Sequence, residues 1–286
     1  MKNQAHSSPV KEFWEQFLQN RLAVLGLVIV IGLVIVAIFA PFFAPQDPTL
    51  QSLPDKRTKP GGKFILGADE FGRDILSRLI YGTRVALLVG ILSVAIALVL
   101  GMVLGTVSGF FGGVVDNLIM RSLDILLAFP YLLLAIAVVS AIGPGVLNTT
   151  IAVGIWATPG FARIIRASVI TIKKADYVLA AKALGASSTR IILSHVTPNF
   201  ISPVIVYSTL YMANAILVEA ALSFLGLGVQ PPTPSWGLMV SSGRDFLLSA
   251  PHIATLPGIA IMTTVLGFNL LGDGLRDSLD PRLRNV

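Results

Sequence analysis

The stretch that decides the fold runs from Val85 to Val115 and reads VALLVGILSVAIALVLGMVLGTVSGFFGGVV. It contains no charged side chain over its whole length. A helix that crosses the hydrocarbon core of a bilayer needs about 20 predominantly apolar residues. The stretch therefore predicts a spanning helix over residues 85–108, which ends at the glycine- and phenylalanine-rich segment 109–113.

Five further stretches of the chain are predominantly apolar. Residues 22–44 are uncharged and precede Pro45 and Asp47. Residues 125–162 are also uncharged, but they are too long for one helix at about 1.5 Å per residue, and the breaker Gly143-Pro144-Gly145 divides them. We therefore predict six spans, at residues 22–44, 85–108, 118–142, 148–165, 201–222 and 253–271.

The composition agrees with a lipid-embedded chain. Hydrophobic residues make up 54% of it and charged residues 13%, and the mean hydropathy is +0.80. Soluble domains carry about 25% charged residues. Backbone amides in hydrocarbon need partners within the same segment, and the apolar runs are too long and lack the alternation of barrel strands. The expected fold is an all-α integral membrane protein with about six transmembrane helices.

The distribution of charge orients the chain. Placing both termini in the cytoplasm puts most of the 21 lysines and arginines on the cytoplasmic side, as the positive-inside rule requires. Residues 1–21 then form a cytoplasmic segment, in which Phe13, Trp14 and Phe17 share one helix face and predict contact with the membrane surface. The other expected parts are an extracytoplasmic loop 45–84, a five-helix core 85–271 with a cytoplasmic loop 166–199, and a cytoplasmic tail 272–286.

Several kinds of chemistry find no support in the sequence. There is no cysteine, no phosphate-binding Gly-Xaa4-Gly-Lys-Ser/Thr loop and no nucleophile elbow. His6, His195 and His252 are too far apart for metal-ligand spacing. The net charge of +6 is scattered between apolar runs, without the continuous basic face that nucleic acid requires. We expect no catalytic, cofactor or metal site and no nucleic-acid partner.

A few ionisable residues lie near the predicted spans. Arg121 and Asp124 are three residues apart, so they can pair on one helix face, and Glu219 is expected as an acid at the membrane surface near a helix end. The alternative is that Arg121, Asp124 and Glu219 belong to a pathway for a substrate or coupling ion, because intramembrane charges often do.

Glycine recurs every fourth residue at the end of the second span, as Gly101, Gly105 and Gly109. Small residues at this spacing let two helices approach closely. The partner helix is either within this chain or in a second membrane subunit.

The segment 173–199 predicts two short helices outside the membrane. Residues 177–184 are alanine-rich and favour a helix, and Gly185 can take a positive φ and end it. A second short helix is expected over residues 187–196, with Pro198 opening the next span. Such a projection either docks into a cleft of another protein or is a plain solvated loop.

Segments 177–187 and 195–199 together resemble the EAA loop of ABC-importer permeases. Leu179 stands where that loop usually has glutamate, so docking here need not involve an acidic contact. Further stretches are similar to the C-type permease of the dipeptide/oligopeptide/nickel group, namely residues 66–78, 120–130, 219–228, 231–237 and 268–277.

This resemblance implies a type I importer architecture and a role for the chain as half of a translocation pathway that works by alternating access. The implied partners are a homologous B-type permease, two cytoplasmic ATPase subunits, an extracytoplasmic substrate-binding protein and membrane lipid, with the machine in a bacterial inner membrane. The chain itself would be no enzyme and would need no cofactor. The implied ATPase-coupling residues are Tyr177, Ala180, Ala181, Gly185, Ala186, Ser187, His195 and Pro198.

The expected substrate is a peptide. Nickel, glutathione or another small solute carried by the same machine remains open. A self-sufficient channel, an ion-coupled carrier or a membrane scaffold is a further alternative, but the spans lack the ionisable groups near the middle of the bilayer that a carrier would need.

Overall fold

The computed structural model describes residues 9–279, and over this range the chain forms helices and no strand. The expectations for residues 1–8 and 280–286 lie outside the described residues. The helices are α1 Pro9–Gln19, α2 Arg21–Ile38, α3 Ala40–Phe43, α4 Ile75–Phe111, α5 Gly113–Leu127, α6 Tyr131–Ile142, α7 Val146–Ile172, α8 Asp176–Ala183, α9 Ser188–Ile191, α10 Ile201–Phe224, α11 Trp236–Gly243 and α12 His252–Leu279.

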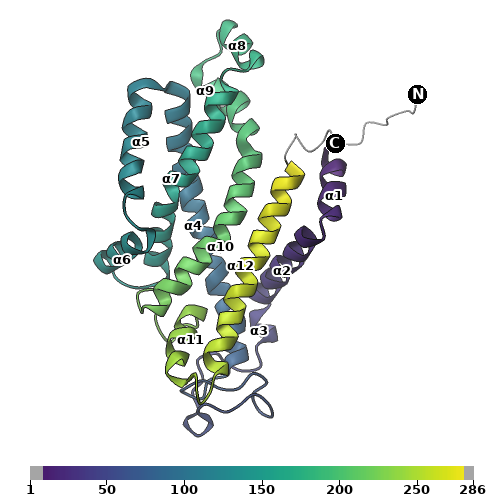
Figure 1. Cartoon of the computed structure of the whole chain (residues 1–286), viewed down its shortest axis with the longest axis vertical. Helices are drawn as coiled ribbons and strands as arrows, with labels where there is room; N and C mark the ends of the chain where they lie inside the picture. Colours follow the sequence, from purple (N-terminus) through teal and green to yellow (C-terminus); the bar gives the residue numbers. More distant parts are fainter. Residues whose placement is uncertain (1–8, 280–286) are drawn as a thin grey trace, which may run out of the picture.

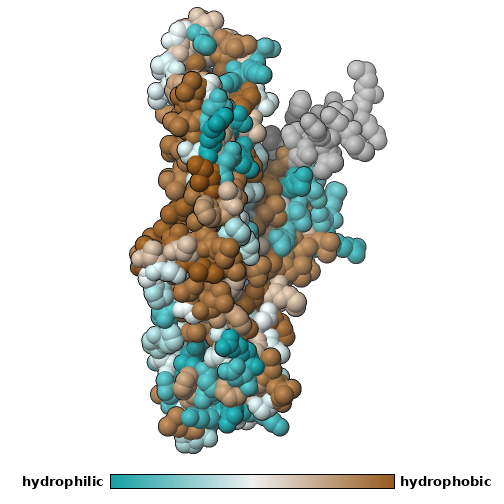
Figure 2. Space-filling model, turned by 60° about the vertical axis from the view of Figure 1, so that its left-hand side comes forward, coloured by the Kyte–Doolittle hydropathy of each residue, from teal (hydrophilic) through white to brown (hydrophobic). Residues whose placement is uncertain are grey.

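The long helices lie side by side along the long axis of the molecule (Figure 1). The small helices α8 and α9 project from one end, and the loop between α3 and α4 lies at the opposite end with α11. Hydrophobic residues dominate the middle of the face in Figure 2, whereas hydrophilic residues gather at the end that carries this loop. An apolar band of this kind is what a bilayer requires of a spanning protein.

Four helical segments are long and apolar enough to cross a membrane: α2, α4, the continuous stretch Ser188–Phe224, and α12. The bent pair α5 and α6 gives a fifth if it counts as one span. Helix α7 is not among these segments, but it packs against α4 (Figure 1). The all-α membrane fold predicted from the sequence is confirmed, and each predicted span corresponds to one helix, to this bent pair or, for the first span, to α2 followed by the short helix α3.

The span predicted over residues 118–142 is wrong as a single helix. Helices α5 and α6 meet at an angle of 89° across a short break. Pro130 lies in that break, where it offers no N–H to a helix and disfavours helical geometry at Phe129. Helix α6 has 12 residues and is about 18 Å long, too short to cross a bilayer alone.

Other helix ends also differ from the predictions. The span predicted to start at residue 85 begins at Ile75, because the Asp74 side chain accepts a hydrogen bond from the Ser77 amide at 2.7 Å and caps the helix. The preceding loop is correspondingly shorter than the predicted 45–84. The span predicted over 148–165 continues to Ile172, so it takes in the start of the predicted polar loop.

The first span is interrupted as well. Helix α2 ends at Ile38, and the short helix α3 starts at Ala40 with Pro41 in its first turn. In helix α1, Phe17 is buried beside Gly274 of α12, whereas Trp14 is 47% exposed. The aromatic residues of α1 therefore do not form one membrane-facing surface, because Phe17 packs inward.

The glycines at positions 101, 105 and 109 pack α4 against α7 within this chain. A β-carbon at Gly105 would lie 2.5 Å from the carbonyl oxygen of Ala162, and one at Gly109 would lie 2.9 Å from that of Arg166. These separations leave no room for a side chain. The glycine spacing thus lets two helix backbones come into direct contact.

Candidate functional site

Helices α8 and α9 rest on a small hydrophobic cluster at one end of the bundle. Val178 of α8, Ile191 of α9 and Val196 are buried. They pack with residues of α7 and with the start of α10, which are Ile165, Val169, Phe200 and Val204. The projection is therefore attached to two long helices rather than suspended on a flexible loop.

The turn between α8 and α9 is built on Gly185, whose φ is +83°. The Gly185 amide donates to the Lys182 carbonyl at 3.0 Å, and the Ala186 amide donates to the Ala181 carbonyl at 3.1 Å. This pair of bonds is a Schellman motif, in which glycine takes the left-handed conformation and stops the helix. The predicted helix over 177–184 and its end at Gly185 are confirmed, apart from a shift of one residue at each helix boundary.

The second predicted helix, over residues 187–196, is only partly present. The Ser187 hydroxyl accepts a hydrogen bond from the Arg190 amide at 3.4 Å and starts α9, which ends at Ile191. The backbone then widens into a π-helical turn up to Val196 and continues through a 3-10 turn into α10. Pro198 lies in that 3-10 turn and has no amide for a regular α-helical ladder, which explains the change in helix type.

The outer surface of the projection carries apolar and small side chains, together with the exposed charged residues Asp176, Lys182 and Arg190. Leu184 is 89% exposed, Leu179 is 51% exposed and Tyr177 is 48% exposed. Ala180 is exposed as well. Leu179 thus presents an apolar side chain at the position where the EAA loop usually has glutamate.

The remaining predicted coupling residues surround this surface. Ser187 and Pro198 are exposed, and Ala181 and Ala186 are half-buried. The ring of His195 lies with its centroid 6.4 Å from that of Tyr177. The structure brings the predicted residues together in one projection.

The predicted ion pair of Arg121 with Asp124 is not formed. Asp124 pairs instead with Arg163 of α7, at 2.5 Å, and both side chains are about half exposed. The sequence could not show this, because the two residues are 39 positions apart and meet only through the packing of α7 beside α5. Arg121 is exposed on α5.

A second ion pair ties the same helices more firmly. Arg166 of α7 donates two hydrogen bonds of 2.6 Å to the two carboxylate oxygens of Asp116 on α5. Ser108 of α4 donates a further bond to Asp116. Bidentate guanidinium–carboxylate pairs are strong and directional, so this network holds three helices in register near the α8 end.

Glu219 is not the surface acid that the sequence predicts. It is 1% exposed, and its Oε1 atom accepts hydrogen bonds from the hydroxyls of Ser223 at 2.7 Å and Ser235 at 3.1 Å. Ser235 precedes α11, which covers the end of α10. Glu219 therefore joins α10 to α11.

We expect Glu219→Gln to fold almost as well as the original chain, because its amide oxygen can accept both serine bonds. Glu219→Ala leaves two buried hydroxyls without an acceptor and should lower the stability by about 1–3 kcal/mol. Thermal unfolding of the detergent-solubilised subunit measures the stability of both Glu219 variants. Glu15→Ala, on the exposed face of α1, is the control. Equal melting temperatures for the alanine and glutamine variants would contradict this role.

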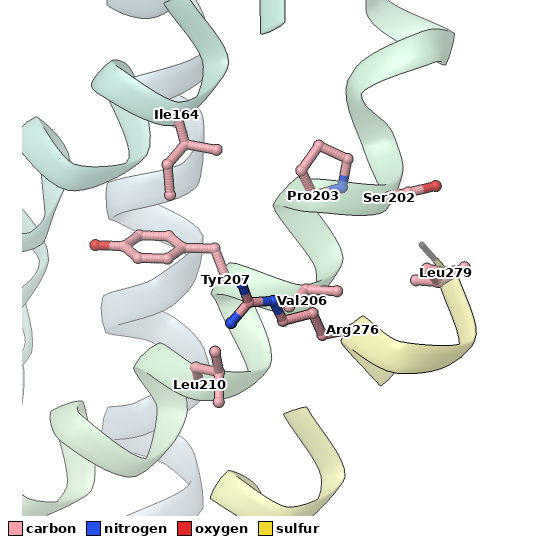
Figure 3. Close-up of a pocket in the computed structure, with 8 residues that line it drawn as sticks. All are labelled: Ile164, Ser202, Pro203, Val206, Tyr207, Leu210, Arg276 and Leu279. Carbon is pink, nitrogen blue, oxygen red and sulfur yellow. The ribbon is translucent and has the colours of Figure 1, made fainter. Parts of the chain in front are cut away.

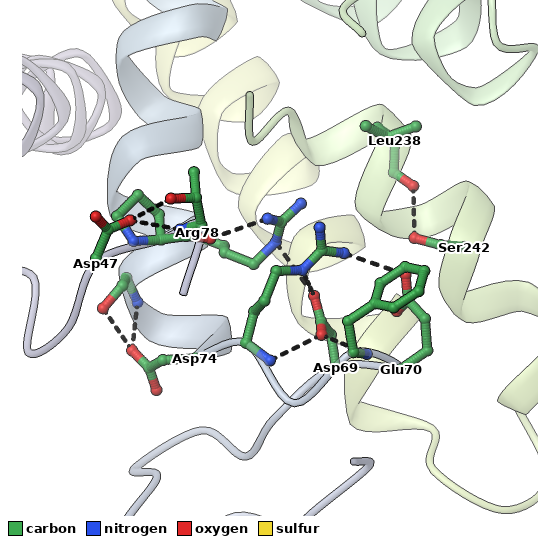
Figure 4. Close-up of polar contacts among 12 residues, drawn as sticks. Asp47, Asp69, Glu70, Asp74, Arg78, Leu238 and Ser242 are labelled. Carbon is green, nitrogen blue, oxygen red and sulfur yellow. Dashed lines mark hydrogen bonds and ion pairs between the residues drawn. The ribbon is translucent and has the colours of Figure 1, made fainter. Parts of the chain in front are cut away.

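A buried charged cluster at the opposite end was not identified from the sequence (Figure 4). Arg73 lies 2.6 Å and Arg78 3.4 Å from the same oxygen of Asp69, and all three residues are buried. Arg78 also donates to the Pro48 carbonyl at 3.0 Å. These contacts attach the loop between α3 and α4 to the start of α4. The signal was present in the segment 66–78, where charged residues cluster just ahead of a span.

The same loop carries an exposed ion pair. Lys63 donates a hydrogen bond to the carboxylate of Asp55, and the Ser52 hydroxyl donates another at 2.6 Å. The Lys63 bond, more than the Ser52 bond, holds the pKa of Asp55 below its usual value. Because the pair is exposed, it organises the loop surface but contributes little to stability.

Two adjoining hollows form a groove along α7, α10 and α12. One has a volume of about 410 Å³ (Figure 3) and lies by the last turn of α12, and the other has a volume of about 260 Å³ and lies near the middle of the bundle. Tyr207 and Leu210 line both hollows. The other lining residues are Ile164, Ser202, Pro203, Val206, Arg276 and Leu279 in the first hollow, and Leu127, Trp156, Ala157, Gly160, Tyr211 and Asn214 in the second.

Comparisons with known proteins agree with these features. Residues 97–285 match the family model described as "Binding-protein-dependent transport system inner membrane component", and residues 8–60 match "N-terminal TM domain of oligopeptide transport permease C". A crystal structure of an amino acid ABC transporter with histidines is similar with a TM-score of 0.53 and 16% identity, and the match covers 68% of this chain and 91% of that one. At this identity the match supports the fold alone.

Curated relatives are similar along almost their entire length. The di/tripeptide transport system permease protein DppC of Pseudomonas aeruginosa is 49% identical, over 98% of this chain and 95% of the relative. The glutathione transport system permease protein GsiD of Escherichia coli is 44% identical, over 97% and 92%. The family match and these identities show that the chain belongs to the family of binding-protein-dependent transport system inner membrane components, as a multi-pass permease subunit.

Proposed function

We propose that this chain is one of the two permease subunits of an ATP-driven importer of short peptides, and that α8 and α9 couple it to an ATPase. The observation that carries the proposal is the projection around Gly185, which has an exposed apolar surface above a buried base. A surface of this kind fits a cleft in another protein, because a cleft buries apolar area that water would otherwise meet. The proposed coupling residues belong to segments 177–187 and 195–199, which resemble the EAA loop.

The connection of this projection to the bundle suggests how motion is transmitted. Ser188–Phe224 is one continuous helical segment of 37 residues, about 55 Å long. It leads from α9 to Glu219 and Ser223, which anchor α11 at the opposite end. A displacement of the projection is therefore passed along this segment, through the π-helical and 3-10 turns at its start, to α10 and the end that holds α11.

The partners follow from this assignment. They are a homologous B-type permease, two cytoplasmic ATPase subunits that hydrolyse ATP, and an extracytoplasmic binding protein. The α8 end and both termini then lie in the cytoplasm, and the loop before α4 faces the binding protein together with α11. ATP changes the equilibrium between inward- and outward-facing forms because it binds one of them better.

Short peptides are the substrate that the relatives support best. One is named for dipeptides and tripeptides and another for dipeptides. Glutathione is a second candidate, because a permease named for it is 44% identical. Glutathione is itself a small peptide with free carboxylates, so both candidates need a pathway for the same chemical class.

Reconstitution tests the proposal. The full complex, in liposomes with ATP available to the ATPase subunits and the binding protein on the other side, should accumulate labelled dialanine. The same liposomes without ATP, or without the binding protein, should not accumulate it. Liposomes that contain this chain alone should neither hydrolyse ATP nor concentrate the peptide. Uptake by the chain alone, or uptake driven by an ion gradient without ATP, would show that the proposal is wrong.

A further inference from the structure

We propose that the groove along α7, α10 and α12 is the wall of the peptide pathway in this chain, and that Tyr207, Tyr211, Asn214 and Arg276 contact the passing peptide. The inference rests on the proposed transport function and adds which residues touch the substrate. The ligand class is a small zwitterionic peptide. Its backbone would bond to uncharged donors and acceptors, and its carboxylate would bond to Arg276.

The first support is a pair of buried polar atoms without partners. Tyr211 is 5% exposed, and neither its hydroxyl nor the buried Nε1 of Trp156 has a hydrogen-bond partner among residues 9–279. Buried polar groups in native proteins are nearly always paired, so an exception calls for an explanation. Both residues line the inner hollow beside Asn214. A side-chain rotation that turns either group into the hollow would let a peptide, or the water around it, complete the bonding.

The second support is the contrast with another hollow of similar size. Between α4 and α10 lies a space of about 480 Å³, lined by apolar side chains apart from Ser208 and Thr209. In this hollow the Thr209 hydroxyl donates a hydrogen bond of 3.0 Å to the Ile205 carbonyl of the same helix. Among residues 9–279, the Ser208 hydroxyl is the one buried polar atom lining the hollow that has no hydrogen-bond partner. A surface of that kind suits lipid or another subunit. Indole, phenol, amide and guanidinium groups gather instead on the α7 side of α10.

The third support is the placement of Tyr207, where the two hollows meet. Its ring lies edge-on to Phe161, with centroids 4.8 Å apart. Its hydroxyl occupies the space above Gly160, where a β-carbon would lie 2.2 Å from the oxygen. The Tyr207 side chain is thus fixed by its contact with Phe161 and by the space that Gly160 leaves on α7. From this position it can contact a peptide in either hollow.

The fourth support is a cation at the mouth of the groove. Arg276 reaches from the last turn of α12 toward Val206 and Tyr207 (Figure 3). No ion pair engages it within the part of the chain that the structure describes. A guanidinium group binds a carboxylate in a bidentate manner. Arg276 is therefore suited to hold the peptide carboxylate at the α8 end of the pathway.

The absence of cysteine from the chain allows a direct test. Asn214→Cys places a thiol in the groove, and the control Thr209→Cys places one on the other side of the same helix. Each full complex is reconstituted and treated with a charged, membrane-impermeant thiol reagent, and modification of this subunit is followed by mass spectrometry. We expect at least about tenfold faster modification at position 214 than at position 209, and slower modification at 214 during dialanine transport. Equal rates, or no protection by dialanine, would overturn the inference.

Transport kinetics give a second, independent test. Arg276→Gln should lower the maximal rate of dialanine uptake about tenfold while ATP hydrolysis by the complex continues, and Arg276→Lys should recover part of the loss. Tyr207→Phe combined with Tyr211→Phe should raise the apparent KM for uptake severalfold. Unchanged kinetics in these variants, with normal uptake by the original complex, would refute the groove assignment alone. Absence of uptake by the original complex would refute the proposed function instead.

Discussion

Gly185→Val is expected to reduce the peptide imported per ATP hydrolysed by at least about tenfold. Gly185 has a φ of +83° and has open space around it, so the penalty comes from the backbone and not from a clash. A left-handed conformation costs an ordinary residue about 1–2 kcal/mol, and a β-branched residue is a clear outlier there. A change of 1.4 kcal/mol in docking is a tenfold change in the equilibrium. The turn would open and move the exposed Leu184 away from its partner.

Gly226→Val is the matched control for this experiment. Gly226 has a φ of +78° and also has open space around it, but it lies at the other end of α10. Its replacement should cost similar stability and leave the ratio of transport to hydrolysis unchanged. Gly185→Asp should act in the direction of the valine variant, but less strongly, since aspartate tolerates a positive φ better. Equal coupling in the Gly185 and Gly226 variants would show that the projection is not the coupling element.

Gly105→Leu is expected to prevent the subunit from folding into its native form. The first atom of the new side chain would lie 2.5 Å from the backbone oxygen of Ala162. A backbone atom cannot move aside as a flexible side chain can, so α4 and α7 must separate along their contact. Overpacking a core by a few atoms costs about 1–3 kcal/mol, and a forced separation of two helices costs more. Size-exclusion of the detergent-solubilised protein should show aggregation or loss of expression.

Gly32→Leu provides the comparison for this substitution. Gly32 lies in the apolar helix α2, and a β-carbon there would meet no atom within 4 Å. Because leucine is also favourable in a spanning helix, this variant should express and elute like the original chain. A Gly105→Leu protein that elutes like Gly32→Leu would mean that the close contact between α4 and α7 is not needed.

Features that depend on neighbouring residues alone could be predicted from the sequence. The long uncharged runs identify the spans, because lipid selects for apolar length whatever the helix packs against. The turn at Gly185 follows from an alanine-rich helix that ends in glycine. The break near Pro130 has a local cause as well, yet the uncharged run conceals it, because apolarity alone does not distinguish one helix from two.

Features that depend on how the helices are rotated and placed were decided by the tertiary structure. The pairing of Asp124 with Arg163, the burial of Glu219 under α11 and the buried cluster around Arg78 join residues that are distant in sequence or lie on different segments. The groove around Tyr207 depends on how α7, α10 and α12 are placed relative to one another. Hydropathy specifies that a helix enters the bilayer, but only side-chain packing between helices specifies which face it turns toward its neighbours.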